Sequence, residues 1–238
     1  MHYSTRSSFI IVVLLCCISL IPTVIHAQAF EGSITMQMAS PMLGNQKIDM
    51  VSMVKGDKVV QTADDPKQGK ITIYTDLKTG TQIIVLEAQR QGMQIDQAVM
   101  DNAIKKMNMP VLIPKATGKT QKIAGYNCEL YTIQLDSTQE MDIWLTKEFP
   151  KDLLVAIRNC TEAGMKNTGV KSDALMALFQ NGYAQVKMEM KYNGITQLTN
   201  EFAKAEPQKL DDSMFTVPTN IKVEKFDPTH MNPGSQGK

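Results

Sequence analysis

Alternation of apolar and polar residues is the dominant pattern along this chain. Apolar residues recur at every second position in four clear runs: Ile34, Met36 and Met38; Ile48 and Met50; Ile71 and Ile73; Val186, Met188 and Met190. Because successive side chains of a strand point to opposite faces, each run predicts a strand with one apolar face. Short turn signals separate such runs, above all Asn193-Gly194, which favours a two-residue type I′ hairpin. Short turns make neighbouring strands antiparallel, so the pattern predicts an antiparallel meander.

Two segments have helical spacing instead. The first places apolar residues at every fourth position before Pro110, at Ile95, Val99, Ala103 and Met107. The second has a capping serine, an apolar stripe and a terminating glycine, at Ser172, Leu175, Leu178, Phe179 and Gly182. A shorter helical turn is expected after Pro150. Helices of this kind cover the apolar face of a sheet. The predicted fold class is therefore α+β, with a large antiparallel sheet forming an unclosed half-barrel covered by two or three helices.

The first 29 residues have the order of a secretory signal: Arg6, an apolar run over residues 9–21, and the cleavage pattern Ala27-Gln28-Ala29. We expect cleavage after Ala29 and a periplasmic or secreted protein. Residues 30–230 are expected to form one domain, and residues 231–238, rich in Gly, Pro, Asn and Ser, a disordered tail. No other segment is long and apolar enough to predict a stable transmembrane anchor.

Charge and histidine content argue against several classes of function. The chain has 25 Lys and Arg against 24 Asp and Glu, and Arg6 leaves with the signal, so 24 basic residues balance 24 acidic ones. Nucleic-acid binding requires a clustered basic face, so no nucleic-acid partner is expected. Of the three histidines, His2 and His26 lie in the signal and His230 lies near the C-terminal end. Histidine-based catalysis and zinc sites need packed histidines, so we expect neither an enzyme nor a cofactor.

Two cysteines, Cys128 and Cys160, follow the signal. An oxidising compartment would permit a disulfide between them. Two separate buried thiols are the alternative, since Cys128 falls within a predicted strand where it would pack as a small hydrophobe. The sequence leaves both interpretations open.

Residues 120–150 contain the most distinctive motif, in which Ile123-Ala124-Gly125-Tyr126 leads into a predicted hairpin that ends with Trp144. Together with the later Lys209-to-Pro218 segment, KLDDSMFTVP, this motif resembles a family of secreted bacterial proteins described only as a domain of unknown function. That family is related in fold to the LolA and LolB lipoprotein carriers. The resemblance implies an open half-barrel whose cavity takes up acyl chains.

Methionine is unusually frequent, with 17 residues, and three pairs have the spacing Met-x-Met. On a strand this spacing places both thioethers on one face, where they would line an apolar cavity, complete an ordinary core, or bind Cu(I). The cavity hypothesis predicts these ligand-binding residues: Met36, Met38, Val99, Met107, Trp144, Leu178, Phe179, Met188 and Met190. The corresponding function is binding of a hydrophobic or amphipathic ligand, such as a lipid or lipoprotein. A structural or interaction module of the cell envelope and a Cu(I)-binding protein are the alternatives.

Overall fold

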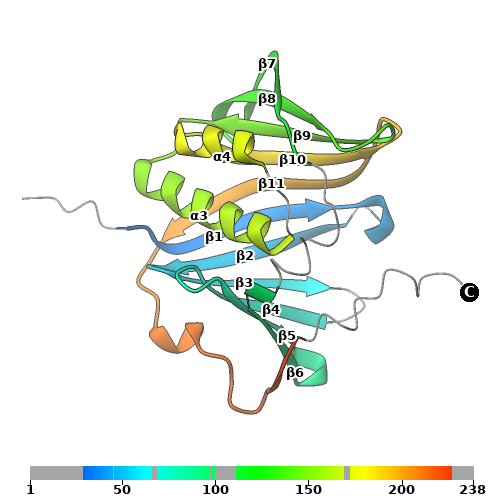
Figure 1. Cartoon of the computed structure of the whole chain (residues 1–238). Helices are drawn as coiled ribbons and strands as arrows, with labels where there is room; N and C mark the ends of the chain where they lie inside the picture. Colours follow the sequence, from blue (N-terminus) through cyan, green and yellow to red (C-terminus); the bar gives the residue numbers. More distant parts are fainter. Residues whose placement is uncertain are drawn as a thin grey trace, which may run out of the picture.

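One sheet of twelve strands organises the described part of the chain in the computed structural model (Figure 1), which covers residues 29–44, 46–65, 69–96, 98–99, 111–168 and 172–226. The strands are β1 (Glu31–Ala39), β2 (Lys47–Lys55), β3 (Lys58–Asp65), β4 (Gly69–Asp76), β5 (Thr81–Leu86), β6 (Gln91–Ile95), β7 (Lys115–Ile123), β8 (Tyr126–Gln134), β9 (Gln139–Thr146), β10 (Ala184–Tyr192), β11 (Ile195–Pro207) and β12 (Lys222–Lys225). Their order is β12-β6-β5-β4-β3-β2-β1-β11-β10-β9-β8-β7.

Two antiparallel meanders make up this sheet. Strands β1 to β6 form the first, β7 to β11 form the second, and pairing of β1 with β11 joins them. Every pair is antiparallel except the short β12, which runs parallel to β6. The two outermost strands, β7 and β12, do not pair with each other, so the sheet is open. The predicted unclosed antiparallel sheet is confirmed.

Tight turns match the residues that the sequence offers at them. Asn193 and Gly194, between β10 and β11, have φ values of 49° and 75°. Ala124 and Gly125, between β7 and β8, have φ values of 49° and 90°. Positive φ at both central residues is the geometry that matches the twist of a two-residue hairpin. The predicted positive φ at Gly125 is confirmed, and Ala124 shares it.

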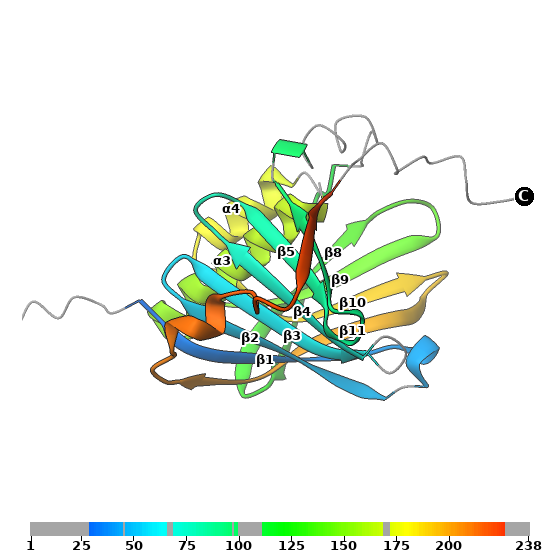
Figure 2. The same ribbon diagram turned by 90° about the horizontal axis from the view of Figure 1, so that it is seen from below.

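Helices α3 (Lys151–Thr168) and α4 (Asp173–Gln180) lie on one side of the sheet, which curves toward them (Figures 1 and 2). The α4 helix begins as predicted, because Ser172 Oγ accepts a hydrogen bond from the Leu175 amide at 3.0 Å. The prediction of only a short turn after Pro150 was wrong, since α3 has 18 residues. Neither helix is long and apolar enough to span a bilayer, within the residues that the structure describes.

The helix predicted from Ile95 to Met107 falls mostly outside the described residues. Ile95 itself is the last residue of β6, so the prediction that a helix includes it was wrong. Pairing of Ile95 with Gln82 of β5 holds it in the sheet. Val99 is half-buried, and its amide donates to the Asp96 carbonyl oxygen at 2.9 Å.

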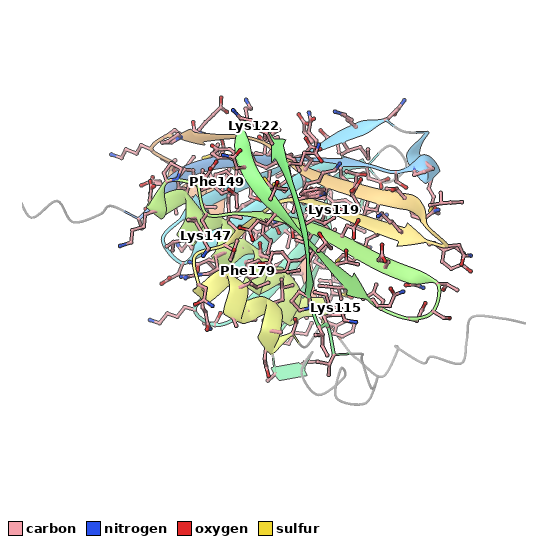
Figure 3. All side chains as sticks on the ribbon, turned by 90° about the horizontal axis from the view of Figure 1, so that it is seen from above. Lys115, Lys119, Lys122, Lys147, Phe149 and Phe179 are labelled. Atoms are coloured by element: carbon pink, nitrogen blue, oxygen red, sulfur yellow. The ribbon has the colours of Figure 1, made fainter. Side chains whose placement is uncertain are left out.

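Each helix packs on its own apolar cluster. In the first cluster, Leu153, Ala156 and Ile157 of α3 pack with Ile34, Val54, Val59 and Phe202 of the sheet. In the second, Leu175 and Phe179 of α4 pack with Ile133, Ile143 and Leu145. Phe179, which is 1% exposed, points from α4 into this second cluster (Figure 3). The two helices therefore cover the sheet over separate parts of one curved layer.

The KLDDSMFTVP segment lies in the connection between β11, inside the sheet, and the outermost strand β12. After β11 the chain passes along β1 and β2 before it reaches β12. Lys55 of β2 donates to the Leu210 carbonyl oxygen at 2.7 Å and forms an ion pair with Asp212 at 2.9 Å. Leu210, 3% exposed, donates its amide to Glu31 of β1. This motif thus holds the connection against the sheet.

Candidate functional site

Strand register gathers the methionines on one face of the sheet. Asn200 of β11 pairs with Met188 of β10 on one side and with Met38 of β1 on the other. Directly paired residues of antiparallel strands point to the same face. The row continues through Ile143 of β9, opposite Met188, and Ile48 of β2, opposite Met38. Five neighbouring strands therefore contribute one row to this face, in which Asn200 is the only polar member.

A second row runs parallel to the first across six strands. Its members pair successively, in the order Phe202, Met36, Met50, Ala63, Ile71 and Leu86. Phe202 is buried, whereas the other five side chains are half-buried. We call the surface formed by these two rows the concave face, because Ile34, two residues before Met36 on the same face of β1, packs under α3. A wide apolar surface is thus only partly covered.

The opposite, convex face of β10 and of the part of β11 beside it is polar. In β10, Lys187, Glu189 and Lys191 alternate with Met188 and Met190. Lys187 forms ion pairs with Glu189 at 3.2 Å and with Glu201 of β11 at 3.9 Å. These pairs are partly exposed, so each contributes little to stability. In β10, the alternation therefore places charged side chains on the convex face and methionines on the concave face.

Asp142 on β9 pairs with Glu189 on the convex face and is largely buried, with 6% of its surface exposed. It accepts hydrogen bonds from Lys191 Nζ and from Thr132 Oγ1, the latter at 2.7 Å. The hydrogen bond to Asp142 raises the pKa of Lys191. The carboxylate is therefore neutralised and satisfied by its neighbours, which is a structural arrangement rather than a reactive one.

An aromatic pocket of about 370 Å³ lies where α3, the β7–β8 turn and the end of β11 meet. The Tyr126 and Phe149 rings are 4.3 Å apart between centroids, and Phe149 lies 4.9 Å from Phe202. Phe202 belongs both to this pocket and to the second row of the concave face. The charged rim consists of Asp152 and Lys204. The pocket thus places aromatic surface at one end of the concave face.

A second pocket, of about 510 Å³, lies between β3, β4 and β5 and the Phe215–Val217 part of the KLDDSMFTVP motif. Tyr74 lines this pocket, and burial raises the pKa of its phenol. Its remaining wall is mixed, with Lys58 and Asp76 beside Val60 and Ile83. Both pockets are therefore bordered by residues of the two sequence motifs.

The predicted ligand-binding residues fall into three groups. Met36, Met38, Met188 and Met190 lie on the concave face and are half-buried. Leu178 and Phe179 pack in the second cluster, whereas Trp144, 9% exposed, packs in the first cluster opposite Leu130. Val99 is half-buried, and Met107 lies outside the described residues. None of those that the structure describes lines either pocket.

Sequence reasoning missed Met50, Phe202 and Asn200. The alternation of Ile48 and Met50 was a usable signal for the first. Phe202 and Asn200 had no such signal, because β11 mixes polar and apolar residues along both faces. Only their register with β1 and β10 places them on the concave face.

Both cysteines are free thiols in the structure. Cys128 is fully buried, and its Sγ donates to the Tyr126 carbonyl oxygen at 3.4 Å. Burial raises the pKa of both thiols, that of Cys160 to about 12. Apolar surroundings hold each as a neutral side chain, so the structure corresponds to the alternative of two separate thiols. In the described ranges, His, Cys, Asp and Glu form no group of three placed to hold a metal ion.

Comparison with known proteins gives a family match. The family described as "Domain of unknown function (DUF4412)" matches residues 30–221. No curated protein matches the sequence.

Similar solved structures are distant in sequence. A chain of the Pseudomonas aeruginosa MucA/MucB complex is 9% identical, with a TM-score of 0.42. The match covers 83% of this chain but only 59% of the length of that one, which is less than two thirds. The Mycobacterium tuberculosis lipoprotein LppX is 9% identical over 76% of this chain and 90% of its own, with a TM-score of 0.39. A LolA superfamily protein from Nitrosomonas europaea is 8% identical over 80% of this chain and 91% of its own, with a TM-score of 0.30. The strand pairing of this chain, not its likeness to these structures, shows that the sheet is open.

Proposed function

The chain belongs to the DUF4412 family, and we propose that it is a non-catalytic binding protein that holds the acyl chain of a lipid or lipoprotein against its concave face. The observation that carries this proposal is the second row, in which five consecutive apolar side chains remain half-buried. A completed core would bury such residues fully. The predicted signal sequence supports a periplasmic or secreted location for this activity.

Energetics favour an acyl chain as the guest of such a face. Burial of each methylene group contributes about 0.8 kcal/mol, so roughly eight buried methylenes would contribute about 6 kcal/mol without any specific polar contact. Methionine suits this role because its unbranched, polarisable side chain adapts to guests of different shape. Met36, Met38, Met50, Met188 and Met190 together supply five such side chains.

Uptake of a fluorescent fatty acid by delipidated protein tests the proposal. Met188→Gln places a polar amide on the concave face and should weaken uptake by about tenfold, because the bound acyl chain would desolvate that amide. Glu189→Gln is the matched control, since it changes the adjacent residue of β10 to the same amide on the convex face. That control should bind within about twofold of the wild type.

Two results would oppose the proposal. If delipidated wild-type protein takes up no fatty-acid probe, and mass spectrometry finds no lipid in the native preparation, the acyl-chain reading fails. If both variants weaken uptake equally, the probe binds elsewhere than on the concave face.

An interaction module that recruits partners through exposed strand edges is the alternative for the cell envelope. Outer strand β7 is exposed over residues 115–122, with Lys115, Lys119 and Lys122 along it (Figure 3). Its register shifts between Ala116 and Thr120, and Gly118 there has φ 74°. Edge lysines and bulges are features that oppose pairing with another strand. This edge therefore gives less support to strand recruitment than the concave face gives to ligand binding.

Cu(I) binding has one structural observation in its favour. Met36 lies directly opposite Met50 across β1 and β2, with Met38 two residues along the same face. Soft thioethers in such proximity suit Cu(I). Copper analysis after incubation under reducing conditions tests this alternative, and a stoichiometric copper content abolished by Met36→Leu would favour it.

A further inference from the structure

Asn200 is an exception on the concave face. Its side-chain oxygen, Oδ1, is buried. Within the described ranges, it is the one buried side-chain nitrogen or oxygen atom that has no hydrogen-bond partner. Its cross-strand neighbours are Met188 and Met38, and its neighbours two residues away on β11 are Leu198 and Phe202. Apolar side chains therefore surround the amide on four sides of the sheet surface.

Two other amides on this face have partners on the neighbouring strand. Gln61 of β3 donates to Ser52 Oγ of β2 at 3.1 Å, and these two residues are paired in register. Gln82 of β5 donates to Thr75 Oγ1 of β4 at 3.1 Å, again between paired residues. Neighbouring strands thus satisfy the amides that serve the fold. At Asn200 the strands on both sides instead present methionine, which offers no donor.

We infer that Asn200 is the specificity-determining residue of the ligand site, and that its Oδ1 accepts a hydrogen bond from a donor carried within an otherwise apolar acyl ligand. This inference rests on the proposed function. Buried acceptors are normally paired, so an unpaired one on a binding face indicates a partner supplied by the ligand.

The position of Asn200 defines the chemistry of that donor. Apolar residues extend from it across two strands in each direction, to Ile143 on one side and Ile48 on the other. A terminal headgroup placed there would put its charge among these side chains, at a high desolvation cost. A neutral hydroxyl in the middle of an acyl chain leaves apolar chain on both sides of the hydrogen bond. The ligand class is therefore an acyl chain with a neutral internal donor.

Competition against the fluorescent fatty acid tests this assignment with two ligands, stearic acid and a stearic acid hydroxylated in mid-chain. Wild-type protein should bind the hydroxylated acid about tenfold more tightly, because only that ligand satisfies both the hydroxyl and Asn200 Oδ1. Asn200→Leu should abolish or reverse this preference, because the leucine side chain offers no acceptor to the hydroxyl. Gln61→Met is the control, since it removes an amide that already has a partner in the fold, and it should retain the wild-type preference.

The outcomes separate the inference from the function on which it rests. Binding of both acids with equal affinity by the wild type overturns the role of Asn200 and leaves acyl-chain binding intact. No binding of either acid rejects the proposed function itself. Retention of the tenfold preference by Asn200→Leu would show that the ligand hydroxyl donates to another residue, and it also overturns the inference. Equal wild-type affinities for the two acids overturn the inference even if Asn200→Leu does not fold.

Discussion

Replacement of Asn200 by leucine should stabilise the unliganded protein, which is an unusual expectation for a substitution in a sheet. Leucine has the same branched skeleton as asparagine, with two methyl groups in place of the amide oxygen and nitrogen. The wild-type oxygen is buried without a partner between Met188 and Met38. The substitution therefore removes an unsatisfied acceptor and places an apolar group among apolar neighbours.

The expected gain follows from the cost of such an acceptor. A buried polar group left without a hydrogen bond costs about 1–3 kcal/mol, and Asn200→Leu relieves that cost. Additional apolar burial acts in the same direction. For a domain of this size, 1 kcal/mol corresponds to roughly 2–4 °C in the melting temperature, so the rise should be about 2–12 °C.

Urea unfolding and thermal melting of delipidated protein measure this effect. Thr199→Leu is the matched control, because Thr199 is the neighbouring residue of β11 and pairs with Glu189 on the convex face, where added apolar surface gains nothing. Its free energy of unfolding should stay within about 0.5 kcal/mol of the wild type. Destabilisation by Asn200→Leu of more than about 1 kcal/mol would refute the reasoning, since it would show that the amide makes a favourable interaction in the folded protein.

Four further expectations follow from the structure and the sequence. Gly125→Val should lower the free energy of unfolding by about 1–3 kcal/mol, because Gly125 has φ 90°, whereas Gly125→Asn should cost less; an unchanged melting curve for the valine variant would contradict this. Val99→Gln should weaken uptake of the fatty-acid probe more than it weakens folding, and equal losses would place Val99 in the core. The Thr138 amide and hydroxyl lower the pKa of Asp136, so this carboxylate stabilises the fold above its unfolded pKa and loses that contribution as pH falls through the lower folded pKa. Asp136→Asn should therefore make stability less sensitive to acid, which unfolding titrations below about pH 4 would show or disprove. N-terminal sequencing of exported protein should begin at Phe30, and an intact Met1 would exclude the predicted cleavage.

Local patterns were sufficient to predict the class of fold. Alternation in β1 and β10, the Asn193-Gly194 turn and the Ser172 cap each depend on residues close together in the chain, and each is present as expected. The same logic would have extended α3, since Leu153, Ala156, Ile157 and Cys160 have the spacing of one helical face. Period-two and period-3.6 patterns are local properties, and a sequence displays them directly.

Only the tertiary structure decided which apolar residues share a surface. Alternation shows that Met36 and Met38 point the same way, but it does not show that β1 lies between β2 and β11. That pairing joins the two meanders and brings Met188 and Met38 to either side of Asn200. Trp144 shows the same limit of local patterns. Its place in the hairpin motif suggested that it lines the cavity, whereas in the structure it packs in the first cluster. The sequence determined the two faces of each strand, whereas long-range register decided which faces meet, because strand pairing joins segments that no local pattern connects.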